Sequence, residues 1–268
     1  MTNTHKGTAL ITGASTGLGA VYADRLARRG YDLILVARDA ARMAALADRF
    51  HAETGRTVEV LPADLTKADD VARIEARFAA DDAITLLVNN AGMSLNGGVL
   101  DSPPAELERI IALNVTAPTR LARAAGNAFV ARGSGGIINI ASVLALAPEM
   151  FDGVYSGTKA YLLNLSHSLA AQIEGKGVRV QAVLPGATRT EIWARSGKDV
   201  DSFPPDWVME AGDLVDAALL GFDRGETVTI PPLADEGEWL AFDAARHAMD
   251  GKLSNRVVAE RYREAVDA

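Results

Sequence analysis

Residues 12–19 read Thr-Gly-Ala-Ser-Thr-Gly-Leu-Gly and lie between a short apolar run, 9–12, and a helical pattern of apolar residues. Glycines in that position let the backbone approach a pyrophosphate closely, and the amino end of the following helix offers unpaired N–H groups and the positive end of its dipole. Ser15 and Thr16 can add hydroxyl donors. The spacing G-x3-G-x-G differs from G-x-G-x-x-G, so a plain strand-to-helix turn is the alternative interpretation. The stretch favours a phosphate-binding turn.

Short apolar runs recur along the chain and alternate with helical patterns. Seven of them are predicted as buried strands, at 9–12, 32–37, 57–61, 84–88, 136–141, 178–184 and 227–230. Because their apolarity is continuous, the predicted fold class is α/β, a Rossmann-like doubly wound parallel sheet of about seven strands with helices on both faces. No linker or repeat interrupts the pattern. We expect one dinucleotide-binding and catalytic domain over 1–268, with a Rossmann core at 7–231, a substrate lid at 190–212 and a C-terminal helical extension at 235–268.

The composition is that of a folded globular chain, since 49% of the 268 residues are hydrophobic and 23% are charged. Thirty-five acidic and 27 basic residues give a net charge of −8, so we expect neither a nucleic-acid nor a membrane partner. The absence of cysteine excludes disulfides, thiolate nucleophiles and cysteine-ligated zinc. The four histidines show no metal-ligand spacing, and we expect no metal. No basic-then-apolar leader precedes the first apolar run, which predicts a cytoplasmic location.

Tyr155 and Lys159 stand four residues apart at the start of a helix predicted over 155–174, so both side chains lie on one helix face. A tyrosine pKa is about 10 and must fall before the phenolate can act near neutrality, and a neighbouring ammonium supplies that stabilisation. Ser142 follows the fifth predicted strand, where doubly wound sheets place ligands, and its hydroxyl can hold a carbonyl or alcohol oxygen. Each residue alone also fits a purely structural role. Together they predict proton transfer at one site.

Four motifs carry a resemblance to a known family. The pattern TGxxxGxG is matched at 12–19, Asn-Asn-Ala-Gly stands at 89–92, Tyr-Ser-Gly-Thr-Lys at 155–159 and Pro-Gly at 185–186. Over 7–231 the chain therefore resembles the short-chain dehydrogenase/reductase family. The resemblance implies a catalytic set of Asn114, Ser142, Tyr155 and Lys159. In that set Asn114, inside a long helix predicted near 105–132, would anchor a water in a proton relay.

The same resemblance implies a nicotinamide dinucleotide cofactor. Asp64 and Leu65 would flank its adenine, Asn90 its ribose side, and Lys159 would also bond the nicotinamide ribose. Thr188 or Thr190 would reach the carboxamide, and the spacing leaves that choice open. The expected cofactor residues are Gly13, Ser15, Thr16, Gly17, Leu18, Gly19, Arg38, Asp64, Leu65, Asn90, Ala91, Gly92, Tyr155, Lys159, Pro185, Gly186 and Thr188.

The end of the second predicted strand bears on the choice between NADP(H) and NAD(H). Members selective for NAD usually carry an acidic residue there, whereas this chain has Ala37 followed by Arg38. An arginine fork suits a 2′-phosphate, which predicts a preference for NADP(H). Asp39 could instead bind a 2′-hydroxyl, but we interpret it as the N-cap of the helix that runs through Phe50.

The expected reaction is hydride transfer between the nicotinamide and a carbonyl or secondary alcohol, with Tyr155 as general acid/base and Ser142 orienting the oxygen. Segments 93–95, 144–151 and 191–207 are expected to bind the substrate, and their apolar residues favour an apolar small molecule. Arg195 could bind an anion, but Glu191 stands close enough in sequence to pair with it. Arginine at 38 favours the reductive direction.

Two other functions are alternatives. A non-catalytic NADP-binding redox sensor or regulatory Rossmann protein would need the cofactor site but not the four catalytic residues together. A serine hydrolase at Ser142 would need a nucleophile elbow, which the surrounding Ile-Ala-Ser-Val-Leu at 140–144 lacks.

The resemblance also implies a homodimer through the helices near 105–132 and 155–174. Many members end soon after a VDGG-like motif, whereas this chain reads Ile-Pro-Pro at 230–232 and continues for 36 residues. That departure puts the family's common tetramer in doubt, although a tetramer stays possible.

Overall fold

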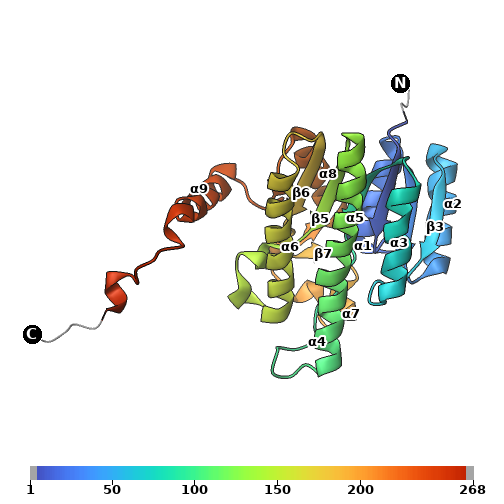
Figure 1. Cartoon of the computed structure of the whole chain (residues 1–268). Helices are drawn as coiled ribbons and strands as arrows, with labels where there is room; N and C mark the ends of the chain where they lie inside the picture. The colour runs from blue at the N-terminus through green and yellow to red at the C-terminus, as the bar shows by residue number, and fades with distance from the viewer. Residues whose placement is uncertain (1–4, 264–268) are drawn as a thin grey trace, which may run out of the picture. The chain divides into compact units, whose positions relative to one another are not determined.

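The computed structural model describes residues 5–263, which divide into two compact units, one ending at Pro232 and the other beginning at Leu233. The boundary lies between the predicted core and the predicted tail. The first unit holds a twisted sheet between two layers of helices (Figure 1). Its sheet strands are β1 (Thr8–Thr12), β2 (Asp32–Ala37), β3 (Val58–Pro62), β4 (Ile84–Asn89), β5 (Gly135–Ile140), β6 (Val178–Val183) and β9 (Val228–Thr229).

These strands form one parallel sheet in the order β3-β2-β1-β4-β5-β6-β9. The predicted fold class is confirmed, and each strand end lies within a residue of the predicted one. β1 pairs with β2 on one side and with β4 on the other, so the order of the strands reverses at this point. Doubly wound sheets bind their ligands at such a reversal, outside the carboxyl ends of the strands.

Two buried clusters of side chains fill the space between the sheet and its helices. α1 (Gly17–Arg28), α2 (Ala40–Thr54) and α8 (Ala211–Arg224) pack on one face through residues such as Tyr22, Phe50 and Leu219. α3 (Ala68–Ala80), α5 (Ala117–Arg132) and α6 (Gly153–Gln172) cover the other face, with Phe78 and Phe129 between them and the sheet. Because both faces are covered, the strands need apolar residues at successive positions rather than alternate ones.

The helix predicted near 105–132 is interrupted. α4 (Pro104–Ile111) and α5 are joined by a π-helical turn at Ala112–Thr116, and this turn contains Asn114. The sequence pattern does not reveal the turn because the chain stays helical through it. Such turns are rare and are frequent at functional sites.

The predicted lid region and the tail have structure of their own. β7 (Thr188–Arg189) pairs in parallel with β8 (Met209–Glu210), and α7 (Ile192–Arg195) lies between them. In the second unit α9 (Glu236–His247) forms as a helix, whereas the second helical pattern of the tail forms 3-10 turns at Asp250–Lys252 and Glu260–Tyr262. In the part of the chain that is described, no helix is both long and apolar enough to cross a membrane.

Candidate active site

One continuous cavity of about 1560 Å³ runs along the carboxyl ends of the central strands and beside the segment 187–207. It is bordered by the loop after β1, the ends of β2, β4 and β5, the start of α6, and the segment after β6. Every sequence-predicted site residue lines it except Gly19 and Asn114, which lie just behind its wall. The reversal point of the sheet therefore brings the predicted catalytic and cofactor residues to one cavity. Residues 5–263 contain no cluster of three or more side chains suited to hold a metal ion.

The glycine loop has a backbone that other residues could not adopt without strain. Gly13 and Gly17 have φ values of +66° and +54°, in the left-handed region that favours glycine. A Cβ at Gly19 would overlap the carbonyl oxygen of Gly13 and lie 2.5 Å from Nδ2 of Asn90. Gly13 and Gly17 therefore expose their backbone to the cavity beside the side chains of Ser15, Thr16 and Leu18. α1 begins at Gly17. These features form the cradle that a pyrophosphate requires.

Asn90 holds this loop against the end of β4. Its Nδ2 donates to the carbonyl oxygens of Thr12, at 2.8 Å, and Gly13, at 3.3 Å. The hydroxyl of Thr12 accepts from the backbone N–H groups of Asn90 and Ala91, each at 3.0 Å. Asn90 therefore fixes the shape of the loop. The same hydrogen bonds hold Asn90 beside the expected ribose site.

Tyr155 and Lys159 lie one turn apart near the start of α6. Asp152 caps this helix by accepting hydrogen bonds from the backbone N–H groups of Val154 and Tyr155. Lys159 Nζ is buried, donates to the carbonyl oxygen of Ile140 at 2.7 Å, and lies 5.6 Å from the centre of the Tyr155 ring. The charged end of Lys159 thus faces both the tyrosine ring and the end of β5.

Burial sets the proton affinities of this pair. It raises the pKa of Tyr155 to about 12, and a hydrogen bond with Ser142 opposes that shift. Burial also lowers the pKa of Lys159 to about 8. The direction for Tyr155 is opposite to the one expected from the neighbouring ammonium, because loss of water around the phenol outweighs other effects in the chain by itself. Near neutrality the Tyr155 phenol is therefore protonated.

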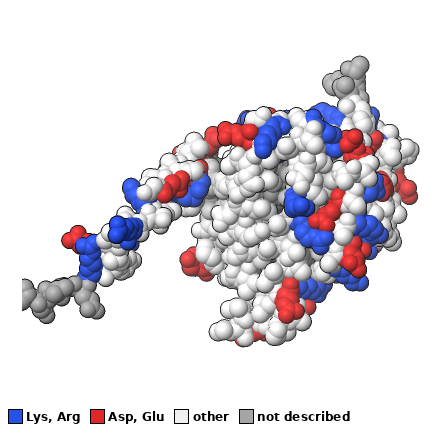
Figure 2. Space-filling view, viewed as in Figure 1, with Lys and Arg blue, Asp and Glu red and all other residues white. Residues whose placement is uncertain are grey.

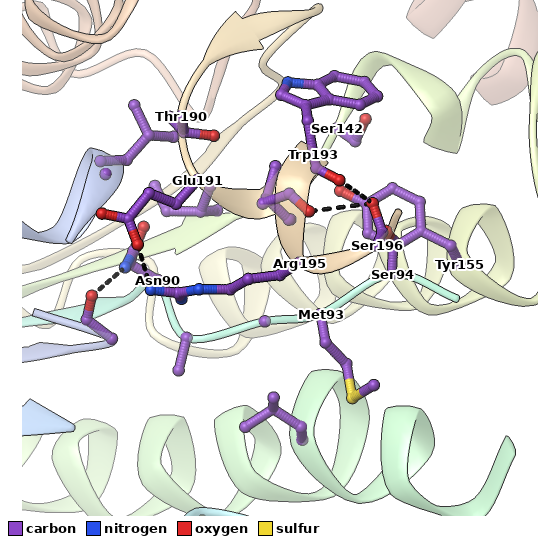
Figure 3. Close-up of a pocket in the computed structure, with 18 of the residues that line it drawn as sticks. Asn90, Met93, Ser94, Ser142, Tyr155, Thr190, Glu191, Trp193, Arg195 and Ser196 are labelled. Atoms are coloured by element: carbon purple, nitrogen blue, oxygen red, sulfur yellow. Dashed lines mark hydrogen bonds and ion pairs between the residues drawn. The ribbon is translucent and has the colours of Figure 1, made fainter. Parts of the chain in front are cut away.

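Ser142 follows β5 and faces the same part of the cavity as Tyr155 (Figure 3). Its Oγ accepts from the backbone N–H of Leu144 at 3.1 Å and donates to the carbonyl oxygen of Pro185 at 3.4 Å. The second contact is long, so the hydroxyl proton can turn to a better acceptor that enters the cavity. Pro185 and Gly186 line the cavity beside it.

Asn114 stands behind the catalytic residues. Its side chain accepts from the backbone N–H of Met93 at 2.9 Å and donates to the Met93 carbonyl oxygen at 2.8 Å and to Thr158 Oγ1 at 3.1 Å. Both amide protons are therefore used within the protein. A Cβ at Gly92 would lie 3.4 Å from Asn114 Oδ1 and 3.5 Å from Lys159 Nζ, so this glycine allows the two side chains to approach the loop after β4.

Arg38 and Asp64 line the far end of the cavity. Among the described residues Arg38 has no hydrogen-bond or ion-pair partner, although its charge helps to lower the pKa of Asp64 against the opposing effect of burial. Asp64 accepts from the backbone and hydroxyl of Thr66, and Leu65 next to it is buried. Asp39 accepts from the backbone N–H of Arg42 at 2.9 Å as the N-cap of α2, so its interpretation as a cap is confirmed.

Aromatic side chains form a wall on the substrate side. The ring of Phe151 lies 5.9 Å from that of Tyr155 and 6.2 Å from that of Trp193, and Trp193 lies 4.8 Å from Phe203. Trp193 Nε1 donates to the carbonyl oxygen of Thr188 at 2.8 Å, which fixes the indole. All four aromatic residues line the cavity together with Thr188 and Thr190, the two candidates for the carboxamide contact.

Sequence reasoning missed several contacts of the lid. Lys198 Nζ lies 3.7 Å from the centre of the Phe151 ring and donates to the carbonyl oxygen of Leu95. Glu191 pairs with Arg195, as its spacing suggested, but also with Arg42 at the start of α2. The sequence offered one indication that Arg42 lies near the site, which is its position four residues, or about one helical turn, after Arg38.

Comparison with known proteins places these features in context. The family model described as short chain dehydrogenase matches residues 7–201. Human 17-beta-hydroxysteroid dehydrogenase type 3 is 34% identical over 188 residues, which are 69% of this chain, and the match spans 60% of the human protein. The structure of a short-chain dehydrogenase from Sphingobium yanoikuyae in complex with NADPH is 51% identical, with a TM-score of 0.92 over 96% of this chain and 100% of that chain. The bulky-bulky ketone specific alcohol dehydrogenase from Comamonas testosteroni is 46% identical, with a TM-score of 0.89 over 97% of this chain and 99% of that one.

Proposed function

The chain belongs to the short-chain dehydrogenase family of oxidoreductases, and on that premise we propose that it is an NADP(H)-dependent reductase of bulky apolar ketones. The observation that carries the proposal is the meeting of Tyr155, Lys159 and Ser142 with the glycine loop at one cavity. A redox sensor would need the loop but not this set of proton-transfer groups.

The residues present fit a dinucleotide. The glycine loop offers exposed backbone and the hydroxyls of Ser15 and Thr16 at the amino end of α1. Asp64 and Leu65 would flank the adenine, and Lys159 lies near Tyr155 on the nicotinamide side. When bound, the nicotinamide supplies the hydride for reduction or accepts it in oxidation. Either Thr188 or Thr190, which both line the cavity, would hold its carboxamide.

The chain's own residues handle the proton. Tyr155, protonated near neutrality because burial raises its pKa to about 12, donates to the carbonyl oxygen during reduction. Ser142 donates a hydrogen bond to the same oxygen and stabilises its developing charge. Lys159 stabilises the tyrosinate that remains, since it carries a positive charge below its pKa of about 8. A water bound at the remaining lone pair of Asn114 Oδ1 would then restore the proton of Tyr155, because both Asn114 amide protons are already donated to Met93 and Thr158.

Preference for NADP(H) is proposed from Arg38. Its guanidinium has no hydrogen-bond or ion-pair partner among the described residues, and Asp39, the acidic residue that follows it in the sequence, is used as a helix cap. Arginine binds a phosphate through two parallel hydrogen bonds, which a 2′-hydroxyl cannot offer. Replacing Arg38 by alanine should therefore weaken the binding of NADPH far more than the binding of NADH. Equal losses of affinity for the two cofactors would contradict this role.

The substrate is proposed to be bulky and apolar. The wall formed by Phe151, Trp193 and Phe203 gives the cavity flat apolar surfaces beside Tyr155. Trp207 and Met150 extend this surface to the mouth of the cavity and are largely exposed there. The name of the similar Comamonas enzyme, which is specific for ketones with two bulky sides, agrees with this shape. The segment 190–212 acts as the lid over this part of the cavity.

We also propose a cytoplasmic homodimer formed through α4, α5 and α6. Ile111 and Tyr161 on these elements are exposed apolar side chains, and Figure 2 shows a largely uncharged surface where α6 lies. Sedimentation analysis of wild type and Tyr161→Glu tests this face, because a charge placed there should shift the dimer toward monomer. An unchanged mass would contradict the assignment.

The function is tested by titrating NADPH and NADH and then following NADPH oxidation with a panel of apolar ketones. We expect NADPH to bind and to be oxidised by diaryl or alkyl-aryl ketones. Tyr155→Phe keeps the ring and should keep NADPH binding while turnover falls by at least about a hundredfold, the lower end for a lost general acid. Binding without turnover of any ketone would favour the sensor.

A further inference from the structure

Glu191, in the segment 190–212, bridges two arginines, Arg42 in the first turn of α2 and Arg195 at the end of α7. We propose that its carboxylate takes the place of the cofactor phosphates and competes with them for Arg42 and Arg195, so that Glu191 sets both cofactor affinity and the preference for NADPH over NADH. The inference rests on the proposed function, because it requires a dinucleotide in this cavity. Arg42, Glu191, Arg195 and Thr16 all line the cavity.

Arg42 provides one side of the bridge. Its Nη1 donates to both carboxylate oxygens of Glu191, at 3.1 and 3.0 Å. Arg42 lies in the first turn of α2, next to the N-cap Asp39 and one turn beyond Arg38. Arg38 has no ion-pair partner among the described residues, whereas Arg42 is paired with Glu191 and, through Nε, with Asp39 Oδ2 at 3.4 Å. The two guanidiniums thus stand at the same end of the cavity, and only one of them is available for a 2′-phosphate while Glu191 holds the other.

Arg195 provides the other side. Its Nη2 donates to Glu191 at 2.7 Å and to the hydroxyl of Thr16 at 3.0 Å (Figure 3 shows the pair with Glu191). Thr16 is the N-cap of α1, and its side chain makes no capping bond within that helix. Arg195 therefore reaches from the lid to the glycine loop, where the pyrophosphate of a dinucleotide belongs. Thr190 packs on the same loop, since a Cβ at Gly17 would lie 3.3 Å from its Cβ.

The bridge is built so that it can exchange partners. About half of each of the three side chains is exposed, so each ion pair is weak and solvent can replace it. Phosphate groups carry more charge than one carboxylate and offer more acceptor oxygens, so the arginines gain by the exchange. A carboxylate left between two phosphates would be repelled by both. Glu191 must therefore turn away when the cofactor enters.

The rest of the lid does not depend on this bridge. Trp193 is fixed by its bond to the Thr188 carbonyl oxygen, and Lys198 by its contacts with Phe151 and Leu95. Gly197, with a φ of +68°, packs so closely on Asn96 that its hypothetical Cβ would lie 2.6 Å from that side chain. Removing the Glu191 charge should therefore release both arginines from the lid without displacing the aromatic wall, and Arg42 should keep its weaker, exposed pair with Asp39.

The two arginines would contact different phosphate groups of the cofactor. Arg42 stands beside Arg38 and meets a phosphate only when the cofactor carries the 2′-phosphate, so its release favours NADPH alone. Arg195 stands at the glycine loop and meets the pyrophosphate that both cofactors share. Loss of the Glu191 charge should thus tighten the binding of both cofactors, and the binding of NADPH more than that of NADH.

The test is Glu191→Gln, with NADPH and NADH dissociation constants measured by nicotinamide fluorescence and without substrate. We expect NADPH to bind the variant about three- to tenfold more tightly than it binds the wild type, which is the range for release of exposed ion pairs. The affinity for NADH should increase by a smaller factor. Glu210→Gln is the matched control, since it removes one charge near the lid that pairs with Arg189 and not with Arg42 or Arg195. It should leave both constants unchanged.

The double variant Arg42→Gln/Glu191→Gln separates the two arms. Compared with Arg42→Gln alone, the double variant should gain the same factor in affinity for NADPH and for NADH, because only the release of Arg195 remains to be measured. Wild-type binding of NADPH with unchanged or weaker binding by Glu191→Gln overturns the inference while leaving the proposed function intact. If wild type binds neither cofactor, the proposed function itself is wrong, and the inference is wrong with it.

Discussion

Replacing Lys159 by methionine removes a buried charge beside Tyr155 while keeping the length of the side chain. The Nζ atom lies 5.6 Å from the centre of the tyrosine ring. With the tyrosinate charge placed at the ring centre and an effective dielectric constant of about 20, an ammonium at that distance stabilises the tyrosinate by about 3 kcal/mol. This equals about two pKa units, so the fraction of tyrosinate at a given pH falls by up to about a hundredfold in the variant.

The assay is kcat/KM for oxidation of a secondary alcohol, measured against pH at saturating NADP⁺. Lys159 is charged only below its pKa of about 8, because burial lowers that pKa. The ratio of wild type to Lys159→Met should therefore be large below pH 8 and shrink as the pH rises through it. Both rates should increase with pH, because the tyrosinate is the base and burial raises its pKa to about 12.

Lys6→Met is the control for this experiment. Lys6 Nζ lies 5.9 Å from the ring centre of Tyr31, which is the same kind of pair outside the cavity, and its loss should not affect either rate. A ratio that stays constant from low to high pH would refute the reasoning, since a lost structural contact has no reason to follow the titration of Lys159.

Three further variants test other parts of the site. Gly19→Ala should weaken NADPH binding by at least about tenfold, because its Cβ overlaps the Gly13 carbonyl oxygen; Gly157→Ala, whose Cβ meets nothing within 4 Å, should bind NADPH normally in the same titration. Asp152→Ala removes the cap of α6 and should lower the free energy of unfolding by about 1 kcal/mol in urea, and an unchanged midpoint would contradict the capping role. Trp193→Ala should raise KM for an aryl ketone by about five- to tenfold through loss of two ring contacts and leave a small aliphatic ketone unaffected, so equal changes for both ketones would argue against the aromatic wall.

The order of strands and helices was predictable because it follows from local patterns. A continuous apolar run such as 32–37 marks a strand covered on both faces, and a glycine loop before a helix marks the place where a phosphate can bind. The residues expected to meet at the site followed from motifs, and the structure does bring Ser142, Tyr155 and Lys159 to one cavity. Asn114 was expected inside a regular helix, because nothing in the local pattern marks the π-helical turn that holds it.

By itself the sequence determined the fold class, the glycine loop after the first strand and the placement of Tyr155 and Lys159 on one helix face, since each depends on residues close together along the chain. Only the tertiary structure decided the proton affinity of Tyr155, because burial depends on everything packed around the phenol. It likewise decided that Glu191 meets Arg42, 149 positions away. Such contacts join elements that the sheet order brings together, and no periodicity along the chain encodes their distance.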